Sequence, residues 1–288
     1  MESDQQRGTA AVMGVTILLA AMMAGCNGVE QSYRIKVAEE FSKQPVSSQA
    51  VLTEADIAPL PSPVRRYIAY TGAVGKRRPQ TMRLLFDAQM TSKPGASPMD
   101  ATSEQYNFFK HPTRLFYMKA SKYLVPFRVL HAYTDEKATM LVRVASLFNA
   151  VDLSGKDLTT AETVTLLNDM CVFAPGNLID KRFAWKEIDS LTAGVTFTNG
   201  QYTVSALLYF NAKGELIDFT SEDRMALQED GTLRKALWST PLRDYKEFDG
   251  RKVPTYGEAL WKYPEANFTY GTFTVKNVEY DIKEYQER

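Results

Sequence analysis

The chain is poor in the residues that build disulfide frameworks and histidine-based metal sites. It has 2 cysteines and 2 histidines among its 288 residues. Two cysteines cannot form a disulfide scaffold, and two histidines provide too few ligands for a zinc site built mainly from histidine. The formal net charge is zero, with 34 Lys and Arg against 34 Asp and Glu, whereas proteins that bind nucleic acid usually carry a basic excess. We therefore expect no metal, no cofactor and no nucleic-acid partner.

Catalytic motifs are also scarce. The sequence has no G-x-S-x-G element, no glycine-rich phosphate loop, no H-E-x-x-H and no C-x-x-C. Either His111 or His131 could act as a general base beside an acid, although histidines without a catalytic role are the commoner case. Cys171 lies in an apolar stretch, which predicts a buried and unreactive thiol. The sequence therefore favours a function other than catalysis.

The one long uncharged segment is at the N-terminus. Residues 9–25 carry no charge and end at Cys26, and Met23-Ala24-Gly25-Cys26 resembles the lipobox of bacterial lipoproteins. We therefore predict a lipoprotein-type signal segment over 1–26, with Cys26 as the lipidation site. An uncleaved N-terminal anchor helix is the alternative. Both interpretations place the protein in the bacterial cell envelope, exported and anchored in a membrane, facing the periplasm or the outer surface.

Past this signal segment, we predict a tether over 27–58 and a single domain over 59–288. Two short helices are expected in the domain. Ser62 and Pro63 begin the first, which runs to about residue 71, before Gly72. The second covers about 160–170, with Thr160 as its cap, before Pro175-Gly176.

In the rest of the domain, apolar and polar residues alternate with a period of two. From Met82 to Met90, apolar and polar residues take turns, and Asn199-Gly200 and Asp249-Gly250 are strong hairpin signals. Hairpin-length connections between roughly ten to twelve such strands indicate a meander rather than βαβ units. We therefore predict a mainly β (α+β) fold, a curved antiparallel meander that forms an incomplete barrel plugged by the two helices.

Large aromatic residues on these strands are candidates for lining a pocket. Tyr106 lies in an aromatic-rich strand, and Trp238 and Trp261 lie on later ones. Tryptophan on a sheet is usually a core residue, but it also supplies contact area for a lipidic or aromatic ligand. Arg224 is the polar candidate. It could hold an anion inside a cavity, although the residues beside it favour a solvated ion-pair face.

Several strings, in the same order, resemble an uncharacterised bacterial family, a domain of unknown function. They run over residues 60–282 and include Leu60-Pro61, Val64-Arg65-Arg66-Tyr67, Gly72-Ala73-Val74-Gly75-Lys76, Glu104-Gln105-Tyr106, Phe148-Asn149-Ala150-Val151-Asp152, Gly155, Arg224, Trp238, Tyr245 to Thr255, and Trp261. The D-G-x-x-V-P string at 249–254 is also similar to that of the LolA/LppX-like envelope carriers. That second resemblance implies an incomplete β-barrel that holds lipids or acyl chains in its concave face. The aromatic residue expected near Cys171-Val172 is absent here, so that side of a pocket would differ.

Three functional hypotheses follow. The first is a membrane-tethered envelope protein that binds a hydrophobic ligand, a lipid or an acyl chain, in the concave face of the sheet without catalysis. The second is a structural or protein-interaction module whose core is completely packed by its own helices. The third, and least favoured, is a hydrolase, which would require His131 and an acid to meet in a pocket.

Overall fold

The structure, a computed structural model, describes residues 28–287 apart from 49, 146–147 and 229–231. Its main feature is a 14-stranded antiparallel sheet. The strands follow the order β6 (Phe148–Ser154), β5 (Lys137–Val144), β4 (Val125–Thr134), β3 (Thr113–Lys122), β2 (Met99–Phe108), β1 (Thr81–Met90), β16 (Asn267–Tyr280), β15 (Arg251–Lys262), β13 (Leu237–Ser239), β10 (Leu216–Ser221), β9 (Tyr202–Phe210), β8 (Thr192–Asn199) and β7 (Phe183–Asp189), while β14 (Leu242–Phe248) pairs with β15. A separate ribbon joins β11 (Met225–Leu227) to β12 (Leu233–Lys235).

The sheet is strongly curved but is not closed into a barrel, because its end strands β6 and β7 do not pair with each other in the described part of the chain. The predicted fold class, an incomplete barrel built from an antiparallel meander, is therefore confirmed. The strands outnumber the expected ten to twelve. Strand β6 shows why, since six of its seven residues are exposed and apolar and polar residues do not alternate along its whole length.

Both predicted hairpins are present. Strands β8 and β9 turn at Asn199-Gly200, where Gly200 has a φ of 58°. Strands β14 and β15 turn at Asp249-Gly250, where both residues have positive φ. Only Asp249-Gly250 is a left-handed pair, since Asn199 does not share the positive φ of Gly200. In both turns a glycine takes the backbone conformation that suits the twist of the flanking strands.

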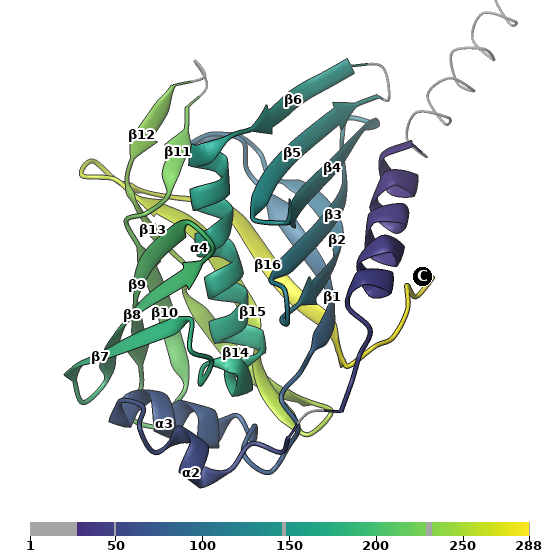
Figure 1. The fold of residues 1–288 in the computed structure, drawn as a ribbon. Helices are drawn as coiled ribbons and strands as arrows, with labels where there is room; N and C mark the ends of the chain where they lie inside the picture. The colour runs from purple at the N-terminus through teal and green to yellow at the C-terminus, as the bar shows by residue number, and fades with distance from the viewer. Residues whose placement is uncertain (1–27, 49, 146–147, 229–231, 288) are drawn as a thin grey trace, which may run out of the picture.

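Helix α4 (Lys156–Phe173) runs through the hollow of the sheet (Figure 1). It was predicted over 160–170 with Thr160 as the cap, but it begins one turn earlier, directly after Gly155. Thr160 is inside the helix, and its hydroxyl donates to the carbonyl of Lys156. Most of the helix is buried, including the polar residues Glu162, Asn168 and Asp169. An amphipathic pattern is therefore weak, because the curved sheet surrounds the helix on several sides.

Smaller helices cover one end of the sheet (Figure 1). They are α2 (Glu54–Ile57), α3 (Ser62–Tyr70) and a 3₁₀ turn over Pro175–Asn177. The predicted first helix is thus present. Its first N–H, that of Ser62, donates to the Glu187 carboxylate at 2.8 Å, so a neighbouring strand supplies the cap.

Residues 28–43 form a helix, although they belong to the segment 27–58 that was expected to be a tether. Val29, Tyr33, Val37 and Phe41 recur every four residues and are buried against the convex face of β2, β3 and β4. This spacing places them on one helix face. This part of the segment is therefore packed onto the body of the protein, and β2–β4 are covered on both faces.

Candidate functional site

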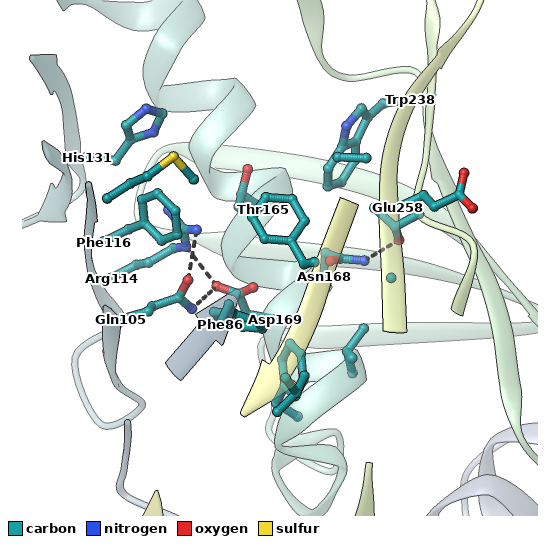
Figure 2. A pocket seen from close by; sticks show the side chains of 18 of the residues that line it. Phe86, Gln105, Arg114, Phe116, His131, Thr165, Asn168, Asp169, Trp238 and Glu258 are labelled. Carbon is teal, nitrogen blue, oxygen red and sulfur yellow. Dashed lines mark hydrogen bonds and ion pairs between the residues drawn. The ribbon is translucent and has the colours of Figure 1, made fainter. Parts of the chain in front are cut away.

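A cavity of about 350 Å³ lies between α4 and the concave face of the sheet. Figure 2 shows its walls, with Phe116 and His131 on one side of the helix and Trp238 on the other. Most of its lining residues are apolar or aromatic: Phe86, Met90, Phe116, Met118, Val129, Met140, Val172, Phe173, Trp238, Leu242, Pro254, Tyr256, Ala259, Tyr270, Phe273 and Val275. A concave apolar wall with a few polar groups is typical of small-molecule sites.

The helix contributes a polar row to this cavity. This row consists of Glu162, Thr165 and Asp169, and the apolar Val172 continues it. The four are spaced by three or four residues, so they share the face of α4 that lines the cavity. Glu162 and Asp169 are buried, at 3% and 6% exposure. Buried carboxylates need charged or hydrogen-bonding partners, and the sheet provides them.

Asp169 is held by three residues of strands β2 and β3. Its Oδ2 accepts hydrogen bonds from Arg114 Nε at 2.8 Å, from Gln105 Nε2 at 2.7 Å and from Asn107 Nδ2 at 3.2 Å. Dashed lines in Figure 2 mark the bonds among Asp169, Arg114 and Gln105. Burial raises the pKa of Asp169 above its ordinary value, and the guanidinium and the two amides offset only part of this effect.

Glu162 is surrounded by three basic side chains. Its oxygens lie 3.3 Å from Arg114 Nη1, 3.6 Å from His131 Nδ1 and 3.7 Å from Arg224 Nη2. Burial alone would raise the pKa of Glu162, but His131, Arg114 and Arg224 outweigh burial and lower the pKa to about 2. Glu162 is therefore a fixed negative charge inside the cavity at neutral pH.

Arg224 lies against two of the tryptophans. Its Cζ is 4.2 Å from the centre of the Trp238 ring and 5.8 Å from that of Trp261, both within cation–π range. The Trp238 Nε1–H donates to the Tyr270 hydroxyl at 3.0 Å, and the Tyr270 ring stacks on Trp261. The arginine therefore rests on an aromatic wall whose rings are held in place.

The predicted pocket residues separate into two groups. Arg224 and Trp238 line the cavity. Trp261 does not line it, but it pairs with Trp238 across β13 and β15, and its ring centre is 5.8 Å from Arg224 Cζ. Arg224 has a side chain only 14% exposed, so the interpretation as a solvated ion-pair face was wrong. Tyr106 does not line the cavity. Side chains alternate along β2, so Gln105 faces the cavity while Tyr106 packs against Tyr33 under the outer helix.

Other predicted residues have varied outcomes. Cys26 lies outside the described residues. Cys171 is fully buried, and burial raises the pKa of its thiol, as expected for an unreactive cysteine. His131 and Glu162 do meet in the cavity, which is the condition that the hydrolase hypothesis required.

The polar residues of the cavity other than Arg224 and His131 were not predicted as site residues. Gln105 and Asn107 alternate with Tyr106 and Phe108 at the end of β2, and Arg114 precedes the apolar lining residues Phe116 and Met118 on β3. This alternation of polar residues toward the inner face is the signal that could have identified them. Glu162 and Asp169 had only their helical spacing as a signal.

The described part of the chain contains neither a metal-binding cluster nor a membrane-spanning helix. No group of three or more His, Cys, Asp and Glu side chains there could hold a metal ion. Likewise, no helix over those residues is long and apolar enough to cross a membrane.

A family model matches residues 50–273. The chain belongs to DUF6544, a family of unknown function. The predicted resemblance to an uncharacterised domain is therefore confirmed. No curated protein matches the DUF6544 chain described here.

Two solved structures are among those similar to this chain. One is a putative outer membrane lipoprotein-sorting protein domain from Vibrio parahaemolyticus, with 8% identity and a TM-score of 0.36, covering 70% of this chain and 85% of that one. The other is a LolA superfamily protein from Nitrosomonas europaea, with 10% identity and a TM-score of 0.35, covering 81% of this chain and 95% of that one. At these identities and scores, neither structure says what the DUF6544 chain binds.

Proposed function

We propose that this protein binds a hydrophobic ligand, a lipid or an acyl chain, in the cavity between α4 and the concave sheet, and that it does so without catalysis. The observation that carries this proposal is the cavity itself. It holds about 350 Å³ and is walled by phenylalanine, methionine, valine and tryptophan side chains. Well-packed protein interiors have few voids larger than a water molecule, so an apolar space of this size is best explained by a ligand.

The size of the cavity favours a single chain. Ligand pockets range from about 300 to 1,000 Å³, and this one is near the lower end. Burying an acyl chain yields about 0.8 kcal/mol per CH₂ group. A chain of about a dozen carbons would therefore contribute about 10 kcal/mol before the costs of association are subtracted.

The alternative of a completely packed interaction module has less support. It requires α4 to fill the concave face, and α4 leaves the cavity open between Thr165 and strands β3, β4 and β15. The protein partner of such a module would also need a surface, whereas the polar groups that converge on Glu162 point inward.

The cellular address is proposed from the N-terminal sequence. Residues 9–25 are uncharged and lead to Cys26. We infer an exported protein of the bacterial envelope, held in a membrane through acyl chains on Cys26, because several chains on one residue anchor stably where one is marginal. The membrane is then both the anchor and the source of the ligand.

The test is native mass spectrometry of the full chain, purified from bacterial membranes in detergent. We expect one co-purified lipid per protein, and lipid extraction would give its class. Thr165→Phe places a ring in the cavity and should abolish the bound lipid. Thr160→Phe, on the same helix but away from the cavity, is the matched control. A lipid-free native protein, or equal lipid content in both variants, would exclude this site.

One observation favours a second function, hydrolysis. His131 Nδ1 lies 3.6 Å from Glu162 Oε1 in the same cavity, and such a pair could activate a water molecule. Among the described residues, no Ser or Thr hydroxyl forms a hydrogen bond with His131, so this reaction would use the activated water itself as the nucleophile. Hydrolysis of p-nitrophenyl esters by the full chain, abolished in His131→Ala, would support this function. Activity that His131→Ala leaves unchanged would reject it.

A further inference from the structure

Two arginines line the cavity, and they differ in how their hydrogen bonds are used. Arg114 is fully engaged. Its Nε donates to Asp169 at 2.8 Å, its Nη2 to Gln105 at 2.9 Å, and its Nη1 to Glu162 at 3.3 Å. All three nitrogens of this guanidinium have acceptors, so Arg114 holds α4 against β2 and β3.

Arg224 has no comparable set of acceptors. Its nearest carboxylate oxygen, Glu162 Oε1, is 3.7 Å from Nη2, which is longer than a hydrogen bond. Its Nε is buried and has no hydrogen-bond partner among the described residues. A buried donor without an acceptor costs free energy, and Arg224 therefore has hydrogen-bonding capacity to spare inside an apolar cavity.

The position of this guanidinium is fixed by the aromatic wall. Trp238 lies under it at 4.2 Å, and the Trp238 ring is itself held by the Tyr270 hydroxyl. Glu162 orients the group by charge, while its own charge is shared with Arg114 and His131. Arg224 is thus preorganised to receive an acceptor, and little entropy is lost when one binds.

From this arrangement we propose that Arg224 binds the anionic head group, a carboxylate or a phosphate, of a single-chain amphiphile. The planar fork of a guanidinium matches the geometry of both groups and can donate to two oxygens at once. The acyl chain lies among the apolar residues of the cavity, toward Phe86, Phe173 and Val275. This inference rests on the proposed function, because it names the class of the hydrophobic ligand.

The test compares three probes that share a dodecyl chain and a photoreactive diazirine: dodecanoate, dodecyl phosphate and dodecanol. Each is titrated against the full chain in nanodiscs of zwitterionic lipid, then cross-linked by light. Mass spectrometry of the peptides that contain Phe86 and Phe173 gives the half-saturation concentration of each probe. For the native protein we expect the anionic probes to half-saturate at a concentration about tenfold lower than dodecanol, which corresponds to about 1.4 kcal/mol.

The variants separate a head-group role from a structural one. Arg224→Gln should remove the preference for the anionic probes, while the half-saturation concentration of dodecanol should stay within about twofold of its value in the native protein. Arg224→Lys should restore part of the preference, because lysine keeps the positive charge without the planar guanidinium. Arg234→Gln is the matched control. Arg234 also covers an aromatic ring, that of Tyr263 at 4.3 Å, but it is paired with Glu265 away from the cavity.

The results distinguish the head-group assignment from the proposal that the cavity binds a hydrophobic ligand. A native preference for dodecanoate assigns a carboxylate, and one for dodecyl phosphate assigns a phosphate. Equal saturation by all three probes, or an Arg224→Gln variant that weakens dodecanol as much as the anions, would overturn the head-group assignment while hydrophobic binding stands. Absence of labelling on the cavity peptides with every probe would overturn both.

Discussion

Arg114 on strand β3 and Asp169 on helix α4 form an ion pair of 2.8 Å, and both side chains are at most 9% exposed. The pair joins the helix inside the hollow to the wall of the sheet. Because Arg114 also contacts Glu162 seven residues earlier on the helix, a single arginine fixes two turns of α4. The cavity exists in its present shape because the helix is held at this distance from the sheet.

Arg114→Ala should therefore lower the free energy of unfolding. The change leaves Asp169 buried without its cation and takes one of two arginines from Glu162, and breaking a buried ion pair typically costs about 3–5 kcal/mol. Denaturant unfolding of the full chain, followed by tryptophan fluorescence, measures this cost. Arg243→Ala is the control, because Arg243 pairs with Glu258 at a side-chain exposure of 55%, and exposed pairs contribute about 0–1 kcal/mol. Equal losses in both variants would contradict the assigned role of Arg114.

The pH dependence of stability should report on Glu162. Its pKa in the folded protein is about 2, against an ordinary value of 4.5. A lowered carboxylate pKa adds stability that is present above pH 4.5 and lost as the pH falls toward 2. We therefore expect the free energy of unfolding of the native protein to fall over this range, and to fall less in Glu162→Gln.

Urea unfolding between pH 2.5 and 6 measures this difference. Glu247→Gln removes an exposed carboxylate instead, and it should retain the pH dependence of the native protein. Asp169, whose pKa burial raises, acts in the opposite direction but is present in all three proteins. Parallel pH profiles for the native protein and Glu162→Gln would show that Glu162 does not carry the expected charge energy.

The helix over 28–43 should contribute to stability. Tyr33 is fully buried and stacks on Tyr117 with 5.3 Å between ring centres. Tyr33→Ala should lower the free energy of unfolding by about 3–5 kcal/mol, the range for large aromatic residues replaced in a core. Ile35→Ala, on the exposed side of the same helix with 49% exposure, should change it by about 0.5 kcal/mol or less. If Tyr33→Ala were as mild, the helix would behave as a tether after all.

Cys26→Ala should prevent covalent lipidation, because it removes the thiol that we expect to be acylated. Cells fed an alkyne-bearing fatty acid should label the native protein and not this variant, while Cys171→Ala should label normally because its thiol is buried. Membrane fractionation adds the second readout. A variant that stays in the membrane without label would support the uncleaved anchor helix, and continued labelling would exclude Cys26 as the acceptor.

The sheet could be predicted from local patterns, but the site could be predicted only in part. Alternation in β1 and the turns at Asn199-Gly200 and Asp249-Gly250 are properties of adjacent residues. The large aromatic residues also indicated a cavity wall. Whether such a residue faces the cavity depends on the strand register and on what covers the other side. Tyr106 illustrates this limit, since the outer helix that buries it lies more than sixty residues away in sequence.

The polar cluster was not predictable for a related reason. Glu162 and Asp169 come from a helix, and Gln105 and Arg114 come from two strands, so only the folded topology brings them together. Arg224 was judged from Glu222 and Asp223 beside it, which favoured an exposed ion-pair face. Its actual neighbours, Trp238 and Trp261, lie on strands that follow later in the chain.

The coverage of β2, β3 and β4 on both faces gives the two sides of the cavity unequal stiffness. Helix α4 packs inside these strands and the helix over 28–43 packs outside, whereas β6, at the free edge beyond β5, is almost entirely exposed. Amide protons exchange slowly where backbone bonds are covered and quickly at exposed edges. The amide protons of β2, β3 and β4 should therefore exchange last. Strands β5 and β6 should separate first when the cavity expands to admit an acyl chain.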